Sequence, residues 1–190
     1  MIQAISKARW QAAQTAERAC HTLGMDEGFA HYAKCYANVF RYLGMETDQH
    51  GKTVLEIGPA DFPALAYCQN YQGIVIEPMQ SDCLSLICET RDIQIINSPV
   101  EEADLPSADS CWIFNVLQHV IDPELLIAKC KEVSQVIRFF EPVDYGTCEY
   151  HPHTFSQRDF ARWFGDSVRR YTDRLPGFFD ADCVYGTWVR

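Results

Sequence analysis

One carboxylate lies within the first apolar run of the chain core and another follows the second run, at a spacing suited to nucleoside binding. Residues 53–57 form an apolar run that contains Glu56 and ends at Gly58, and residues 74–76 form a second run followed directly by Glu77. A strand, a glycine turn, a helix and a second strand that ends in an acid form an adenosine site in open α/β sheets. The glycine lets the backbone approach the ligand, and the acid accepts hydrogen bonds from ribose hydroxyls. The spacing therefore predicts that Glu77 holds a ribose.

The residues of this turn distinguish between two kinds of cofactor. A pyrophosphate-binding turn has the pattern Gly-x-Gly-x-x-Gly, and its three glycine positions are occupied here by Gly58, Ala60 and Pro63. The two missing glycines disfavour a nicotinamide-dependent reductase. The turn instead resembles the first motif of the class I S-adenosylmethionine (SAM)-dependent methyltransferases, Glu/Asp-x-Gly-x-Gly-x-Gly. Glu56 and Gly58 match that motif, Ala60 is a near match, and Phe62 replaces the last glycine.

A later segment carries a more specific resemblance to the same family. Residues 115–123 read Asn-Val-Leu-Gln-His-Val-Ile-Asp-Pro, which closely resembles the Val-Leu-Glu-His-Val-x-Asp-Pro signature of small-molecule SAM methyltransferases. Gln118 stands where the family has an acid. His119 follows an apolar run, residues 111–114, so it is expected at the sheet edge where open α/β folds bind ligands. It is a candidate for contact with substrate, although a lone histidine is more often structural.

The resemblance implies SAM as the cofactor and a set of residues that bind it. Gly58 and Ala60 would admit the methionine moiety. Glu101 and Glu102 belong to an acidic loop, residues 97–106, which borders the adenine in the family; the alternative is that both are simply solvated. The expected cofactor-binding residues are Glu56, Gly58, Ala60, Glu77, Glu101, Glu102 and Asn115.

Methyl transfer from a sulfonium needs the protein mainly to orient the reactants and exclude water, because the cofactor carries the reactivity. A base is needed only when the acceptor keeps its proton at neutral pH, as a hydroxyl does. His119 and His153 are the candidate catalytic bases. Glu149, His151 and His153 also raise the option of a metal site, but they lack a recognised ligand spacing, so no metal is expected. The expected partner is a small-molecule methyl acceptor.

The composition predicts a soluble globular protein with neither a nucleic-acid nor a membrane partner. A chain of 190 residues with 47% hydrophobic residues can bury a substantial core. The net charge of −10 argues against phosphate binding, and no apolar run approaches the about 20 residues of a membrane span. The nine cysteines are scattered without a Cys-x-x-Cys pair, which suits a reducing cytosol. We therefore expect a cytoplasmic protein, and a homodimer is left open.

The hydrophobic periodicity predicts a single α/β domain over residues 1–190, with N-terminal helices in residues 1–48 and a Rossmann-like core in residues 52–190. Residues 46–52 read as a polar linker. The expected helices are residues 2–23, 29–43, 64–71, 80–88 and 124–133, and one directly after Ser156. The expected strands are residues 54–57, 74–76, 93–96, 111–114, 136–140, 168–172 and 183–189. The family has an antiparallel last strand, so the resemblance implies a three-layer sandwich around a seven-stranded, mostly parallel sheet.

Two interpretations of function remain. The first is a SAM-dependent O- or N-methyltransferase. The second is a non-catalytic methyltransferase-like module that has lost the cofactor, because Phe62 and Pro63 crowd the turn and Gln118 replaces an acid. In the second case an apolar patch or an oligomer interface should take the place of the cofactor. The position of Phe62 separates the two: inside the cofactor space it would exclude the ligand.

Overall fold

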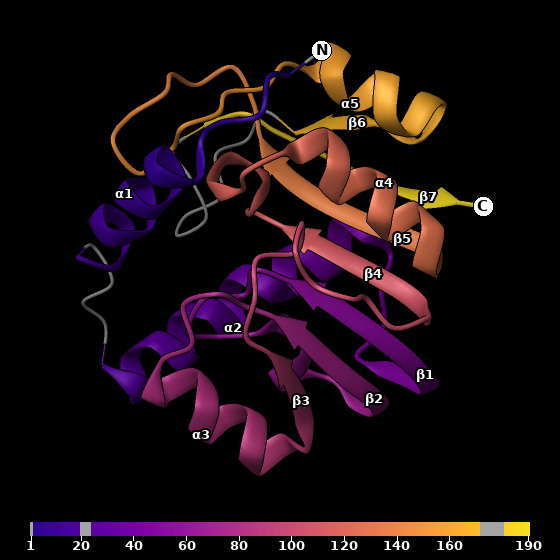
Figure 1. Cartoon of the computed structure of the whole chain (residues 1–190). Coiled ribbons are helices and arrows are strands. Elements are labelled where there is room, and N and C mark those ends of the chain that lie inside the picture. The colour runs from indigo at the N-terminus through magenta and orange to yellow at the C-terminus, as the bar shows by residue number, and fades with distance from the viewer. Residues whose placement is uncertain (1, 20–23, 172–180) are drawn as a thin grey trace.

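One twisted sheet forms the centre of the computed structural model, which describes residues 2–19, 24–171 and 181–190 (Figure 1). Its strand order is β3-β2-β1-β4-β5-β7-β6. The strands are β1 (Asp48–Ile57), β2 (Gln69–Ile76), β3 (Ile93–Ile96), β4 (Ala108–Phe114), β5 (Ser134–Pro142), β6 (Arg169–Tyr171) and β7 (Cys183–Val189). The first five strands run parallel, and β7 is antiparallel to both β5 and β6. The Rossmann-like fold with an antiparallel last strand is confirmed; six of the described strands have four or more residues, and β6 is a three-residue edge strand.

Helices cover both faces of the sheet. They are α1 (Lys7–Arg18), α2 (Met25–Leu43), α3 (Asp82–Arg91), α4 (Pro123–Val133) and α5 (Gln157–Phe164). Neighbouring strand residues alternate between the two faces. Val54 packs into a core with side chains of α2 and α3, whereas Leu55 packs into a core with side chains of α4 and α5. The expected three-layer arrangement is therefore present, and α1 lies outside it, across the carboxyl ends of the parallel strands (Figure 1).

The helices expected at residues 124–133 and directly after Ser156 are confirmed, and capping side chains begin both of them. The Asp122 side chain accepts a hydrogen bond from the backbone N–H of Leu125, with a proline in the first turn of α4. Ser156 and Asp159 form a capping box at the start of α5. Gly44 adopts the left-handed conformation, φ +60°, just after α2.

The ends of the N-terminal helices differ from the prediction. Helix α1 begins at Lys7, because the Ser6 side chain accepts the backbone N–H of Arg9 and caps it there. Helix α1 ends at Arg18, and Gly24 directly precedes α2, which begins at Met25 and not at the expected residue 29. Residues 20–23 and 172–180 lie outside the described residues, and with them the last residues of the expected helix 2–23 and of the expected strand 168–172.

The connection between β1 and β2 is the main departure from the predicted fold. Instead of a helix over residues 64–71, the chain makes a single 3₁₀ turn, η1 (Ala64–Tyr67), and β2 begins at Gln69. Gln69 pairs with Asp48, so the segment predicted as a polar linker is the first half of β1. The helix is absent because pairing with this extended β1 takes the residues that its second half would need. The backbone N–H groups of Ala64 and Leu65 instead donate to the buried carboxylate of Glu56.

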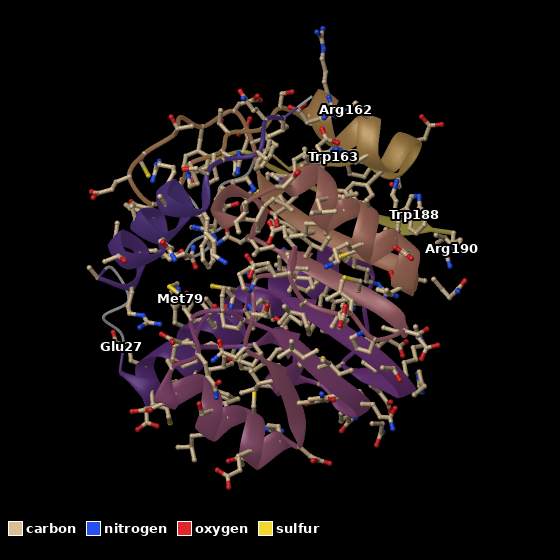
Figure 2. All side chains as sticks on the ribbon, viewed as in Figure 1. Glu27, Met79, Arg162, Trp163, Trp188 and Arg190 are labelled. Carbon is tan, nitrogen blue, oxygen red and sulfur yellow. The ribbon has the colours of Figure 1, made fainter. Side chains whose placement is uncertain are left out.

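The amphipathic sequence of α5 determines which of its faces packs against the rest of the molecule. In Figure 2, Arg162 of α5 points away from the molecule, and Trp163 turns toward α4. The indole N–H of Trp163 donates to Glu124 Oε2 at 2.8 Å.

Within the described ranges, none of the helices combines the length and hydropathy that a membrane crossing requires.

Candidate ligand-binding site

A cavity of about 100 Å³ lies at the carboxyl ends of β1, β2 and β4, under α1. This is the edge at which parallel α/β sheets bind ligands. Its floor combines the loops after these strands, and its roof is one face of α1. The lining residues are Trp10, Gln14, Glu17, Tyr32, Tyr36, Ile57, Gly58, Pro59, Ala60, Ile76, Glu77, Pro78, Met79, Pro99, Val100, Glu101, Phe114, Asn115, Val116, His119 and Val120.

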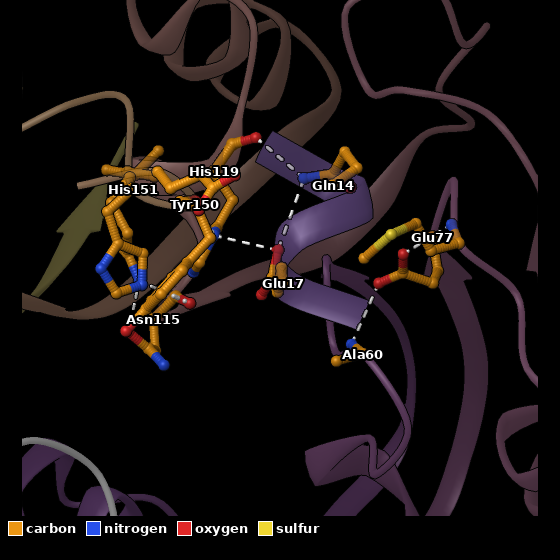
Figure 3. Close-up of polar contacts among 12 residues, drawn as sticks. Gln14, Glu17, Ala60, Glu77, Asn115, His119, Tyr150 and His151 are labelled. Carbon is orange, nitrogen blue, oxygen red and sulfur yellow. Dashed lines mark hydrogen bonds and ion pairs between the residues drawn. The ribbon is translucent and has the colours of Figure 1, made fainter. Parts of the chain in front are cut away.

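Glu77 lies in the cavity wall and ties two of these loops together. Its Oε2 accepts the backbone N–H of Ala60 at 3.0 Å, and its Oε1 accepts that of Met79 at 2.8 Å (Figure 3). Burial raises the pKa of the Glu77 carboxyl to about 7. A carboxylate oxygen has more than one lone-pair site, so both oxygens of Glu77 can also accept hydrogen bonds from hydroxyls. The structure thus places Glu77 where the sequence predicts a ribose contact.

Glu56 has a different position, because it does not line the cavity. Its two oxygens accept the backbone N–H groups of Ala64 and Leu65 at 2.7 and 3.0 Å, and burial raises its pKa to about 7. Glu141, near the end of the last parallel strand β5, does the same for Val116 and Leu117 at 2.9 and 3.3 Å, with a pKa raised by burial to about 8. Both carboxyls therefore hold the loops that shape the site. The signal for Glu141 in the sequence was its place at the end of an apolar run.

The turn after β1 depends on two residues in the left-handed region. Gly58 has φ +59°, and a Cβ there would lie 2.1 Å from a methyl carbon of Val116, so only glycine fits. Ala60 has φ +52°, which costs a residue with a Cβ roughly 1–2 kcal/mol. Both residues line the cavity, as the motif predicts. The alanine that departs from the motif is thus accommodated at a conformational cost.

Replacing Ala60 with glycine should therefore stabilise the protein. We expect Ala60→Gly to raise the free energy of unfolding by about 0.5–1 kcal/mol, because relief of the left-handed strain exceeds the added freedom of the unfolded chain. Urea denaturation measures the change. Ala13→Gly, inside α1, is the control and should destabilise by about 1 kcal/mol. A lower denaturation midpoint for Ala60→Gly would contradict the interpretation.

The two acids of the loop after β3 are separated by the structure. Glu101 lines the cavity, and its Oε1 accepts the backbone N–H groups of Ile121 and Asp122, both at 2.8 Å. Burial raises the pKa of Glu101. Glu102 points away and forms an exposed ion pair with Lys7 at 2.6 Å. Of the predicted pair, Glu101 alone belongs to the site.

Asn115 and Gln118 explain a second departure from the family motif. Asn115 lines the cavity with φ +61°, and Gln118 is fully buried beneath it. The Gln118 amide group donates to both the backbone oxygen and Oδ1 of Asn115, at 3.1 and 2.6 Å. A carboxylate cannot donate, so the amide is the side chain that this loop needs. Among the described residues, the Oε1 atom of Gln118 has no hydrogen-bond partner.

His119 meets the roof helix at the edge of the cavity. Its Nδ1 lies 3.0 Å from Glu17 Oε2 and 3.1 Å from the backbone oxygen of Tyr150 (Figure 3). Gln14 Nε2 also reaches the backbone oxygen of His119 at 3.4 Å. Sequence reasoning found His119 but missed Glu17. The available signal was helical spacing, since Trp10, Gln14 and Glu17 recur every three or four residues along one face of α1.

A second histidine that the sequence analysis did not select for catalysis lies behind His119. The rings of His119 and His151 meet edge to face, with centroids 4.6 Å apart, and the Tyr145 hydroxyl pairs with His151 Nδ1. Burial, then the neighbouring His119, lower the pKa of His151 to about 4, so its ring is neutral at physiological pH. His151 therefore supports the ring of His119 without adding charge.

The structure does not bring His153 into the cavity. Its Nε2 lies 2.9 Å from the backbone oxygen of Val120, and the ring stacks on Phe155. Burial lowers its pKa. His153 thus fixes the loop before α5. Across residues 2–19, 24–171 and 181–190, no three His, Cys, Asp or Glu side chains are placed to hold a metal ion.

Phe62 is buried but lies outside the cavity, in a small core with Ala66 and Ile87. Its ring stacks on Tyr32 with centroids 5.1 Å apart, and its backbone oxygen accepts the hydroxyl of Tyr36 at 3.0 Å. Phe62 therefore fastens the turn to α2. It leaves the cavity clear.

The residues of the cavity fit SAM in kind, although the closed cavity is small. Glu77 suits a ribose, Met79 and Val100 offer apolar surface for a base, and the acidic wall suits a cationic sulfonium. Sites for small molecules typically have about 300–1,000 Å³, against about 100 Å³ here. The difference lies in the roof, where Trp10 and Glu17 of α1 enter the space. With α1 in this position, the cavity is therefore smaller than the sites that usually hold a ligand of this size.

Known proteins match this chain in structure, but none was found to match it in sequence. No family model and no curated protein sequence matches the chain. The N1-methyltransferase of 1,6-didemethyltoxoflavin from Burkholderia thailandensis, solved with its substrate and S-adenosylhomocysteine, is similar in structure: TM-score 0.64, 13% identity, covering 100% of this chain and 92% of the other. The N-methyltransferase NodS from Bradyrhizobium japonicum, with S-adenosylhomocysteine, has TM-score 0.60 and 14% identity over 84% of this chain and 87% of the other.

A similar fold also occurs in a protein that is named as a cyclase and not as a methyltransferase. The cyclase SpnF has TM-score 0.50 and 16% identity, covering 60% of this chain, which spans 46% of the cyclase. The comparisons therefore show that the chain has the fold of the class I SAM-dependent methyltransferases. A fold does not by itself determine the reaction, which must be argued from the site.

Proposed function

We propose that the protein is a SAM-dependent methyltransferase that acts on a small-molecule acceptor by O- or N-methylation. The observation that carries this proposal is the position of Glu77, buried in the cavity wall between Ala60 and Met79. Its carboxylate would accept the ribose hydroxyls, Gly58 and Ala60 would lie against the methionine moiety, and Glu101 would border the adenine. When bound, SAM supplies a methyl group activated by its sulfonium.

The protein supplies orientation and exclusion of water. Helix α1 closes the cavity with Trp10, which is 9% exposed, and with Glu17. The glutamates hold the floor loops in place, so the reactants meet in a fixed geometry. Six of the free cysteines are buried and distributed over several elements, which supports a protein of the reducing cytoplasm.

Isothermal titration with S-adenosylhomocysteine tests the proposal. We expect saturable binding by the wild-type protein and a loss of about 10–100-fold in affinity in Glu77→Ala, since hydrogen bonds to a charged group contribute about 1.5–3 kcal/mol. Glu102→Ala is the matched control: this glutamate is exposed, pairs with Lys7 and should leave the affinity unchanged. Circular dichroism checks that each variant is folded. Wild-type affinity in Glu77→Ala would remove the role of Glu77.

The second candidate function is a non-catalytic module with a permanently closed site. It is favoured by one observation, the roof helix that leaves only about 100 Å³ free. Trp10→Ala distinguishes the candidates, because it thins the roof without touching the floor. Binding of S-adenosylhomocysteine by the wild-type protein supports the enzyme, whereas binding by Trp10→Ala alone, or by neither protein at millimolar ligand, supports the closed module.

A further inference from the structure

A shielded carboxylate–imidazole contact, whose partners come from distant parts of the sequence, joins the roof of the cavity to its floor. Glu17 belongs to α1, and His119 ends the short 3₁₀ turn η2 (Leu117–His119) after β4. Glu17 Oε2 lies 3.0 Å from His119 Nδ1, and the two side chains are only 14% and 11% exposed. The pair is therefore largely removed from water, where a charge interaction is stronger than at the surface.

The contacts of the ring determine which nitrogen of His119 carries the proton. Nδ1 faces the Glu17 carboxylate and, at 3.1 Å, the backbone oxygen of Tyr150. Both partners accept hydrogen bonds and neither donates. In the neutral ring the proton must therefore lie on Nδ1, and the lone pair lies on Nε2. A carboxylate that fixes a histidine in this tautomer also stabilises the imidazolium that forms when the ring takes up a proton.

The charge of the cavity limits the molecules that this base can serve. Three carboxylates, those of Glu17, Glu77 and Glu101, line it, and the described lining residues include no lysine or arginine. An acceptor that carries a carboxylate or a phosphate would therefore be repelled. A hydroxyl keeps its proton at neutral pH and needs a base for attack, whereas the lone pair of a neutral amine does not.

Taking the proposed methyltransferase function as the premise, we propose that Glu17 and His119 form a general-base dyad for O-methylation of an uncharged acceptor with a hydroxyl group. His119 is the base, and Glu17 is its positioning residue. Nε2 of His119 takes the hydroxyl proton as the acceptor oxygen bonds to the methyl carbon. The carbon–sulfur bond breaks, its electron pair goes to sulfur, and the imidazolium later releases the proton to solvent. Since Glu17 is carried by α1, closing the roof assembles the base.

Nitrogen NMR of histidine-labelled protein tests the dyad independently of turnover. With S-adenosylhomocysteine bound, we expect the His119 signals of a ring protonated at Nδ1 and unprotonated at Nε2, and a larger fraction protonated at Nε2 in Glu17→Ala, where only the backbone oxygen of Tyr150 still accepts the Nδ1 proton. Glu102→Ala is the control and should keep the wild-type signals. A wild-type ring protonated at Nε2 would overturn the dyad. If the wild-type protein fails to bind S-adenosylhomocysteine, the proposed function fails instead, so the two failures are distinguishable.

The acceptor class is tested with labelled SAM and matched probes: 4-methylphenol, 4-methylaniline and 4-hydroxybenzoate. We expect methylation of the phenol and at least tenfold less of the aniline and the anionic probe. For the phenol, kcat should fall about 100-fold or more in His119→Asn and about 10–100-fold in Glu17→Gln, with KM changed less than about threefold. No transfer to the phenol by a protein that binds S-adenosylhomocysteine, or equal transfer to the aniline, would overturn the assignment.

Discussion

Replacing Phe62 with glycine, the residue that the methyltransferase motif has at this position, should lower the free energy of unfolding by about 3–5 kcal/mol. The ring is 4% exposed and packs between η1, α2 and α3. Removing it leaves a cavity under a turn that has no helix to close it. Urea denaturation measures the loss. Phe62→Leu, which keeps most of the apolar volume, should cost less, about 1–2 kcal/mol.

Gly28 provides a second measurement of the same packing. A Cβ on this residue of α2 would lie 2.1 Å from the ring of Phe62, so Gly28→Ala alone should cost about 1–3 kcal/mol. In the Phe62→Gly background the added methyl group meets empty space, and the same change should be neutral or stabilising. The double-mutant cycle should thus give a coupling above about 1 kcal/mol. A loss below about 1 kcal/mol in Phe62→Gly, or additive changes, would contradict this account.

A measurement of cofactor affinity distinguishes a loss of core packing in Phe62→Gly from an effect of Phe62 on the ligand-binding site. Phe62 lies outside the cavity, so Phe62→Gly protein that is folded should bind S-adenosylhomocysteine about as tightly as wild type. Weaker binding together with unchanged stability would mean that Phe62 acts on the site after all. The departure of Phe62 from the motif is therefore explained by packing and not by a lost ligand.

The sequence was informative where one short segment determines the outcome. Asp122 and Ser156 cap helices through their own side chains, and Glu77 follows directly from the strand that ends before it. It was misleading where the outcome depends on pairing between distant segments. Residues 64–71 have an acceptable helical pattern, but Gln69 pairs with Asp48, a partner that no local pattern reveals.

The same limit applies to the site. His119 was found because its motif is contiguous, whereas Glu17 acquires a role only when α1 folds back over η2. His153 has the residue type of a base, but its ring is used by the backbone oxygen of Val120. A residue type therefore predicted a position in the cavity wall only where a strand end also fixed that position.

Three buried glutamates should make the protein less stable as the pH rises from 6.5 to 8. Burial raises the pKa of Glu56 and Glu77 to about 7 and that of Glu141 to about 8. Unfolded, these carboxyls titrate near pH 4.3. In this window the folded state therefore holds protons that the unfolded state has lost, so stability falls with pH and the slope ends as the folded groups ionise. The three shifts together predict a loss of about 3 kcal/mol across the window.

Below about pH 6.5, two buried histidines oppose the fall of stability with rising pH. His151 and His153 have pKa values lowered by burial, so below about pH 6.5 the unfolded state takes up protons on these rings and the folded state does not. Their contribution has the opposite sign, is about half complete at pH 6.5 and adds less than about 1 kcal/mol above it. Between pH 6.5 and 8 the larger glutamate shifts therefore determine the sign of the slope.

Glu141→Gln tests the origin of the slope. The amide keeps the shape of the side chain and an oxygen that can accept the N–H of Val116, but it cannot titrate. Urea denaturation at pH 6.5, 7.2 and 8.0 should give a slope about half that of wild type, whatever the absolute stability of the variant. Glu102→Gln, at an exposed ion pair with Lys7, should keep the full slope. A wild-type stability that is constant or rises over this range would show that the buried carboxyls are ionised, held as anions by the backbone N–H groups that they accept.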